Sequence, residues 1–243
     1  MKNSDKQNPI DAHMNLLLAA LPESEFNRIL PNLQLVNLPL GKCLSESGEQ
    51  MSCVYFPTTA IVSLLYNMES GSSAEIAVVG NDGVVGISLF MGGLSTPNRA
   101  IVQSSGYAFK LTEAYVKYEF NRSQVFQKFM LRYTMALFAQ VSQTAACNRY
   151  HTVEQQLCRW ILLHLDRLPS NELFMTHELI ANMLGVRREG VTIAAEKLQK
   201  AGLISYSRGH ITVLNRHGIE ERVCECYESV KKEVNRLFAD PIE

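Results

Sequence analysis

The chain has 243 residues, of which 47% are hydrophobic, and its formal net charge is −1 at pH 7 with a pI of about 6.6. This length suggests one large domain or two ordinary ones, with ample apolar material for a core. The near-neutral charge excludes a protein that binds nucleic acid through its overall charge, so any such contact must come from a local basic patch.

Neither a secretory signal nor a membrane span is expected, because the opening MKNSDKQNP is polar and no apolar run approaches the length of a membrane helix. The cysteines show no CxxC pairing, which favours reduced, structural thiols in a cytoplasmic protein. They are Cys43, Cys53, Cys147, Cys158, Cys224 and Cys226. Cys224 and Cys226 are expected on one helix, where residues two apart point to nearly opposite sides. We therefore expect no metal site and no cofactor.

The first half of the chain is predicted to be rich in strands. An amphipathic helix at Leu16–Leu30 is broken into two pieces at Pro22. Beyond Pro31, short runs rich in Val, Ile, Tyr and Phe alternate with turn sequences such as SGEQ, ESGSS and GNDG. Such runs without intervening helices predict an antiparallel sandwich or barrel of about eight strands over residues 31–112.

This predicted barrel offers little material for catalysis. No histidine lies between Met14 and Tyr150, which excludes a histidine-built cupin metal site and a histidine-ligated haem from the barrel. The carboxylates of Glu46, Glu49 and Asp82 lie in turns and are expected to be solvated. Because no nucleophile with a base, paired carboxylates or phosphate loop stands out, we predict no catalytic residue and no enzyme.

A short helix is predicted at Thr112–Ser123, followed by a long one without Gly or Pro at Gln124–Arg149. A 4-3-4-3 spacing typical of a heptad seam places one set of side chains on a single face of the long helix. That face carries Phe126, Met130, Tyr133, Leu137, Gln140, Thr144 and Cys147. A second apolar surface beside it carries Phe129, Phe138 and Val141. We interpret the long helix as a dimerisation helix; the alternative is a core helix buried on both sides in a monomer.

A hinge is predicted at Asn148–His151, with His151 as a surface residue; the alternative is a proton or ligand sensor at His151. The T-x-x-Q capping box of Thr152 and Gln155 starts the next helix, which contains Trp160 and ends before Pro169.

Two helices joined by a glycine turn are predicted next. Thr176 caps the first helix, and Gly185 ends it because glycine adopts the left-handed conformation without strain. The apolar face of the first helix carries Leu179, Ile180, Met183 and Leu184, and that of the second carries Val191, Ala194, Ala195 and Leu198. The following LISYSRGHITVL predicts a hairpin about Arg208-Gly209. Together these elements predict a winged helix-turn-helix.

The first turn of the second helix projects Arg187, Arg188 and Glu189 outward. An arginine fork fits the O6 and N7 of guanine, and a carboxylate accepts from the N4 of cytosine, so this pattern favours a reader of base edges. Arg208 and His210 are placed where a wing tip would meet phosphate. The alternative interpretation of these charges is a solvated helix end.

A C-terminal amphipathic helix is predicted from Gly218 to Phe238, including both Cys224 and Cys226. Its apolar face is expected to cover the winged domain, with a second dimer contact as the alternative.

The order of β-barrel, long helix and winged helix-turn-helix resembles the Crp/Fnr family of bacterial transcription regulators over nearly the whole chain. The local match lies in Thr176, Leu184-Gly185-Val186, Arg188-Glu189 and Val191. The resemblance implies that Arg188 and Glu189 read bases. It also implies that Thr176 contacts phosphate. From their positions around the second helix and the wing, we further expect Arg187, Thr192, Arg208 and His210 to contact the DNA backbone.

The helix-turn-helix also departs from the family pattern. Arg187 replaces the Ser or Thr that usually caps the recognition helix, Gly190 lies in its first turn, and Ile193 stands near the place of a further base-reading arginine. The operator sequence of the family is therefore not assigned to this protein.

The sensor half departs further. Gly83-Val84 stands where cyclic-nucleotide-binding members carry Gly-Glu, and Arg99-Ala100 stands where they carry the phosphate-binding arginine. Valine cannot accept a hydrogen bond from a ribose hydroxyl, so cyclic AMP is not expected to bind in the usual way. Val84, Arg99 and Ala100 mark the predicted effector pocket for an unidentified small molecule. The N-terminal cysteine cluster of an Fnr-type iron–sulfur sensor is also missing.

We therefore predict an α+β protein with an N-terminal antiparallel β-roll or double-stranded β-barrel, a long dimerisation helix and a C-terminal winged helix-turn-helix. The predicted domains are a sensor at 1–115, the dimerisation helix and hinge at 116–150, the DNA-binding domain at 151–217 and the C-terminal helix at 218–243. The predicted function is regulation of transcription by a cytoplasmic homodimer on palindromic double-stranded DNA, with RNA polymerase as a partner. The alternative is a β-sandwich ligand-binding or protein-interaction module without specific DNA binding.

Overall fold

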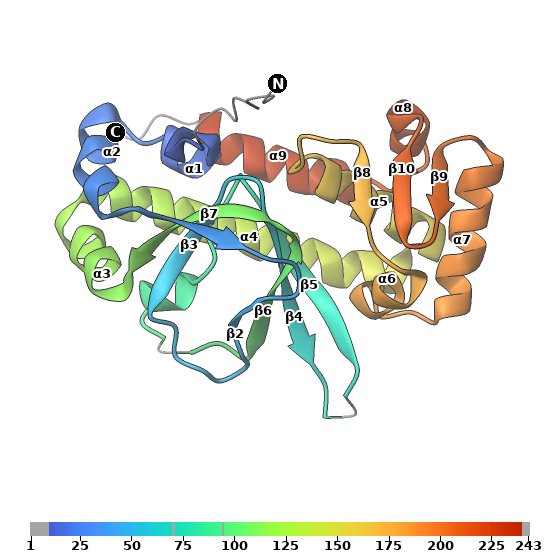
Figure 1. Ribbon diagram of the computed structural model, residues 1–243, viewed down its shortest axis with the longest axis horizontal. Coiled ribbons are helices and arrows are strands. Elements are labelled where there is room, and N and C mark those ends of the chain that lie inside the picture. Colours follow the sequence, from blue (N-terminus) through green and yellow to red (C-terminus); the bar gives the residue numbers. More distant parts are fainter. Residues whose placement is uncertain (1–9, 70, 94, 240–243) are drawn as a thin grey trace, which may run out of the picture.

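The computed structural model describes residues 10–69, 71–93 and 95–239. In Figure 1 a β-barrel occupies one end of the molecule, a smaller module with a three-stranded sheet occupies the other, and the long helix α4 runs between them. The polar opening MKNSDKQNP, in which no signal was expected, lies outside the described residues.

Short N-terminal helices cover one edge of the barrel. They are η1 (Ala12–Met14), α1 (Leu16–Ala19), α2 (Glu23–Ile29) and η2 (Leu30–Asn32). Pro22 is the N-cap of α2, which confirms the predicted break. The buried Asn15 side chain donates to the carbonyls of Pro57 (2.8 Å) and Gly83 (2.9 Å), and it thereby fastens this segment to the barrel.

The barrel consists of two antiparallel sheets. The strands in the described residues are β1 (Gln34–Leu38), β2 (Cys43–Ser45), β3 (Cys53–Pro57), β4 (Ile61–Asn67), β5 (Ser73–Val79), β6 (Asn98–Ser104) and β7 (Gly106–Thr112). One sheet has the order β1-β7-β3 and the other β2-β6-β4-β5. The strand-rich domain predicted at 31–112 is therefore present, with η3 (Ile87–Leu89) within its β5–β6 connection, and it is followed by the helices α3 (Glu113–Arg122) and α4 (Gln124–Tyr150).

The heptad-like seam of α4 is buried within its own chain, so this one of its two predicted apolar surfaces packs on the barrel and is not open to a partner. Its first four members belong to the core of the barrel, namely Phe126, Met130, Tyr133 and Leu137. The Gln140 side chain accepts from the Val78 amide (2.7 Å) and donates to the Val78 carbonyl (3.2 Å). Thr144 is half-buried and donates to the Gln140 carbonyl, and Cys147, the last residue of the predicted set, is fully buried. Over a few turns, the spacing of a coiled-coil seam is nearly the same as that of a helix packed on a sheet.

The second module follows a shorter hinge than predicted. Helix α4 continues to Tyr150, so only His151 and Thr152 separate it from α5 (Val153–Leu165). The capping box of Thr152 and Gln155 is confirmed. The remaining elements are β8 (Glu172–Phe174), α6 (His177–Leu184), α7 (Arg188–Lys200), β9 (Ile204–Ser207) and β10 (His210–Val213), with sheet order β8-β10-β9.

The C-terminal segment is not one continuous helix, and that prediction was wrong. It forms α8 (Arg216–Glu220) and α9 (Cys226–Ala239), and Cys224 lies in the non-helical connection between them. Cys224 and Cys226 therefore do not share a helix, and that prediction was also wrong. Along α9, Tyr227 and Val230 join the core of the second module, whereas Leu237 joins the core of the barrel. The helix therefore covers the winged module, as expected, and also α4 (Figure 1).

The barrel and the second module pack directly on each other. Ile61 and Val78 of the barrel belong to the same buried cluster as Trp160 of α5. Asp82, which was expected to be solvated, instead forms an ion pair with Arg167 beyond α5. Glu46 pairs with Arg99 at 3.2 Å, with 46% of its side chain exposed.

In the described part of the chain, no helix combines the length and hydrophobicity that crossing a bilayer requires.

Candidate nucleic-acid interface

Helices α6 and α7 form the predicted pair with a tight glycine turn. Thr176 is the N-cap of α6 and accepts from the Leu179 amide at 3.3 Å. Gly185 has φ 66° and ψ 33°, the left-handed conformation expected at the end of a helix. Ile180, Met183 and Leu184 are buried as predicted, but Leu179 is 45% exposed and does not belong to that apolar face.

The exposed face of α7 presents the side chains predicted to read bases. Arg187 is the N-cap residue and makes no side-chain capping bond, so its guanidinium is not used to begin the helix. Arg188 and Glu189 follow in the first turn and are exposed. Arg188 lies 3.9 Å from Glu178 through its Nε atom, with 66% of its side chain exposed, so this weak pair leaves the guanidinium accessible.

The second turn of α7 adds one apolar and one polar group. Ile193 is 57% exposed. Thr192 donates to the Arg188 carbonyl (3.1 Å) and lies 3.1 Å from Nδ1 of His177, the ring of which stacks on Tyr206. Burial lowers the pKa of His177, so the neutral ring is favoured beside Thr192. Thr192 is thus tied to its own helix and to α6.

The wing is a two-residue hairpin. Arg208 and Gly209 both have positive φ, at 50° and 79°, which a type I′ turn requires, and Arg208 is exposed at the tip. The His210 ring stacks on Phe174 with centroids 4.5 Å apart, and its Nε2 lies 3.5 Å from Glu172. Strand β8, which the sequence patterns missed, therefore orients His210 and leaves Arg208 as the cation at the tip.

Between the barrel and α4 lies a cavity of about 230 Å³. Its lining includes Met51, Leu64, Ala100, Leu137 and Phe138, and none of the described residues that line it is charged. Ala100 of the predicted effector pocket lies in this lining. Val84 is fully buried and Arg99 is paired with Glu46, and neither lines the cavity.

The glycine of the cassette-like segment has a packing role. A Cβ atom on Gly83 would lie 2.5 Å from the ring of Tyr133, so only glycine fits beneath this side chain of α4.

Residues 155–222 match the family model of the Crp-like helix-turn-helix domain. This part of the chain is therefore a Crp-like helix-turn-helix domain. No curated protein matches the sequence significantly. This match to a DNA-binding domain supports the prediction of a regulator rather than an enzyme.

Three solved structures illustrate the shared Crp/Fnr fold. FixK2 from Bradyrhizobium japonicum has a TM-score of 0.67 and 15% identity over 79% of this chain and 98% of its own. TTHB099, a CRP-family transcriptional regulator from Thermus thermophilus, has a TM-score of 0.65 and 16% identity over 77% and 95%. TTHA1359, a CRP/FNR-family regulator from the same organism, has a TM-score of 0.62 and 20% identity over 80% and 98%.

Proposed function

We propose that this Crp/Fnr-type protein binds a palindromic DNA site as a homodimer and thereby regulates transcription. The observation that carries the proposal is the exposed first turn of α7, where Arg188 and Glu189 are held outward by a helix whose opposite face is buried. In the major groove, Arg188 would donate to guanine and Glu189 would accept from cytosine.

Ile193 extends this reading surface by one turn. It stands near the place where the family pattern has a further arginine, and its exposed side chain is suited to the methyl group of thymine. The surface therefore combines a cation, an anion and an apolar group. We infer that the operator differs from that of family members that carry the further arginine.

The backbone contacts would come from several groups around the reading surface. Arg187 and Arg208 supply exposed cations at the start of α7 and at the wing tip. Thr176 lies at the N-terminus of α6, where amide hydrogens favour phosphate, while Thr192 and His210 are held by contacts within the domain. Such contacts fix the register of a protein on DNA without reading sequence.

The dimer surface would be the outer face of α4 rather than its buried seam. Leu131, Met135 and Phe138 are 40%, 59% and 65% exposed, and their spacing of four and three residues puts them on one side of the helix. Two copies paired there would present their α7 helices to successive major grooves, about 34 Å apart.

The barrel would act as the sensor. Its uncharged, mostly apolar cavity offers nothing to neutralise a phosphate, so the cavity favours a small apolar molecule over cyclic AMP. RNA polymerase is the partner expected of a DNA-bound regulator of this type.

In vitro selection from random DNA with the full chain tests this function. The expected product is a palindrome with half-sites one helical turn apart. Recovery of unrelated sequences would instead support the alternative of a protein-interaction module without specific DNA binding.

A further inference from the structure

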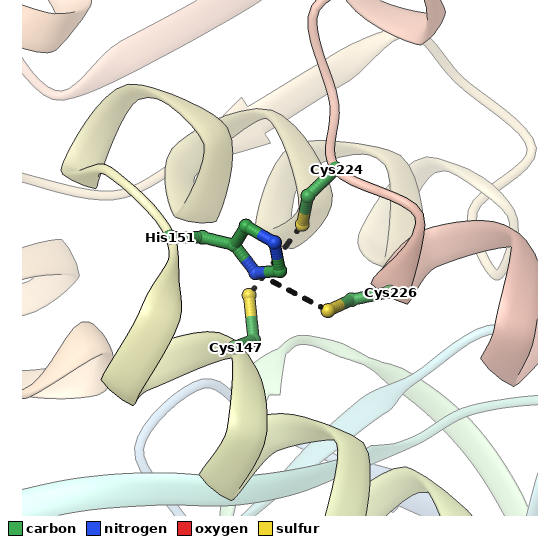
Figure 2. A group of neighbouring side chains, drawn as sticks. All are labelled: Cys147, His151, Cys224 and Cys226. Atoms are coloured by element: carbon green, nitrogen blue, oxygen red, sulfur yellow. Dashed lines mark hydrogen bonds between the residues drawn. The ribbon is translucent and has the colours of Figure 1, made fainter.

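Four side chains converge beside the hinge between α4 and α5, as Figure 2 shows. This cysteine–histidine cluster consists of Cys147, His151, Cys224 and Cys226. Their ligand atoms all lie within 4.8 Å of one another. The three cysteines are buried and the histidine is half-buried. All three thiols are free.

The backbone explains why these side chains meet. Cys147 and His151 lie four residues apart at the end of α4, so they share one side of the helix. Cys224 lies in the break before α9, and Cys226 is the first residue of α9. The break removes the helical geometry that would have turned the two thiols apart, and both point toward the end of α4 (Figure 2).

The distances fit a single tetrahedral ion. Zinc–sulfur bonds of about 2.3 Å and zinc–nitrogen bonds of about 2.0–2.1 Å place two sulfurs about 3.8 Å apart and a sulfur and a nitrogen about 3.6 Å apart. The Sγ atoms of Cys147 and Cys224 are 3.6 Å apart, and Sγ of Cys226 is 3.4 Å from Nδ1 of His151. A multi-iron cluster would need its ligands spread over separate metal atoms.

The groups around the cluster suit metal ligation. Nδ1 of His151 faces the thiols, while its Nε2 lies 3.3 Å from Glu225. A carboxylate on the second ring nitrogen is the usual device that orients a zinc-binding histidine. Nε2 of Gln143 donates to the sulfur of Cys226 at 3.0 Å.

A buried cation lies near the cluster. Arg159 is 7% exposed, its Nη2 atom donates to Thr144 Oγ1 (2.9 Å), and its buried Nε has no hydrogen-bond partner among the described residues. Arg159 lies close enough to Cys147 for its charge to act on the thiol, although the contact with Cys224 and burial raise the pKa of Cys147. Three thiolates, a neutral imidazole and a divalent ion carry a net charge of −1, which would offset this cation.

We propose that the cysteine–histidine cluster binds one Zn²⁺ ion in tetrahedral Cys₃His coordination, with release of the thiol protons. The ion joins the end of α4 to the start of α9, which packs on both the barrel and the winged module. It thereby fixes the two-residue hinge from which α5 departs. The site is independent of the proposed DNA operator.

Metal analysis of the full chain, purified under reducing conditions, tests the proposal. We expect one zinc per chain by mass spectrometry. After replacement by Co²⁺, we expect the intense visible bands of tetrahedral cobalt and a near-ultraviolet thiolate-to-cobalt band. Cys226→Ser and His151→Ala should each weaken Co²⁺ binding by about a hundredfold or more, and Glu225→Gln by about tenfold. Cys43→Ser, which alters a half-buried thiol on β2, should bind Co²⁺ as the wild type does.

The hinge gives a second readout. Removal of zinc by a chelator should increase amide exchange at residues 147–153 and 221–228, whereas the barrel strands should be unaffected. Wild-type protein that is folded by circular dichroism but shows no tetrahedral cobalt spectrum would overturn the proposal. So would a labile-sulfide iron cluster, a Cys147–Cys224 disulfide that is present in the protein as purified under reducing conditions, or equal loss of cobalt binding in Cys43→Ser. Each of these readouts is independent of DNA, so a failed operator selection would leave this test intact.

Discussion

Arg167 and Asp82 form a two-point ion pair that joins the winged module to the barrel. Nε of Arg167 donates to one carboxylate oxygen at 2.9 Å and Nη2 to the other at 2.6 Å. The two side chains are only 4% and 14% exposed. Because paired charges at such a buried contact lose most of their hydration, their removal one at a time is costly.

Asp82→Asn should lower the free energy of unfolding by about 3 kcal/mol, since it leaves the Arg167 cation without its anion. Urea denaturation measures this change. The control is Glu46→Gln, which alters an exposed pair and should cost less than about 1 kcal/mol. Equal losses in the two variants would show that the Arg167 pair does not hold the modules together.

Glu75 gives the stability a pH dependence. Burial raises its pKa to about 7, against the attraction of Arg159 and Arg167. The folded chain therefore holds a proton that the unfolded chain releases above pH 4.5. This contribution is complete below pH 4.5 and is lost as the pH rises through about 7.

The free energy of unfolding of Glu75→Gln, relative to the wild type, should therefore rise by about 3 kcal/mol between pH 4.5 and 7. Denaturation at several pH values measures it. The comparison between the two proteins removes the opposite contribution of His164, the pKa of which burial lowers to about 3. A difference that stays constant across this range would mean that Glu75 is ionised in the folded chain.

Gly190→Ala should stabilise the winged module. A Cβ atom at Gly190 would lie 3.6 Å from Val153, which is ordinary contact, and alanine is favoured over glycine in a helix by about 1 kcal/mol. Thermal unfolding should show a higher midpoint. In contrast, Gly106→Ala would bring a Cβ atom within 2.5 Å of the backbone of Ala60 and should lower the midpoint. Destabilisation by Gly190→Ala would show that the start of α7 needs glycine.

The outer face of α4 can be tested with two methionines of similar exposure. Met135 on α4 is 59% exposed, and Met68 at the β4–β5 turn is 58% exposed. Met135→Glu should convert a dimer to a monomer in light scattering, because it buries a charge in an apolar contact. Met68→Glu should leave the dimer intact. A monomeric wild type at micromolar concentration would contradict the proposed assembly.

The elements set by local chemistry could be predicted from the sequence, whereas the contacts between distant segments could not. Thr152 with Gln155 and Gly185 mark helix ends through neighbours within a few residues. Strand β8 is only three residues long and exists because it pairs with β10. Nothing local indicates that Cys147 meets Cys224, since 77 positions separate them.

In the candidate site, too, local features could be predicted and contacts between distant segments could not. The exposed first turn of α7 follows from its own apolar spacing, so Arg188 and Glu189 could be placed from the sequence. The burial of the α4 seam depends on contacts with the barrel. The side of α4 that faces a partner could therefore not be predicted from the sequence. Arg99 on β6 likewise pairs with Glu46 at the end of the neighbouring strand β2, which the one-dimensional match to a nucleotide cassette does not reveal.

The reading of bases by Arg188 is the central claim, and mobility-shift titration on the selected palindrome tests it most directly. Arg188→Ala should raise the dissociation constant on that site by about 10- to 100-fold and relax selectivity at one base pair, while weak non-specific binding changes little. Arg122→Ala, which alters a half-exposed arginine on α3, should bind as the wild type does. If Arg188→Ala keeps the full affinity and base preference of the wild type, Arg188 does not read bases.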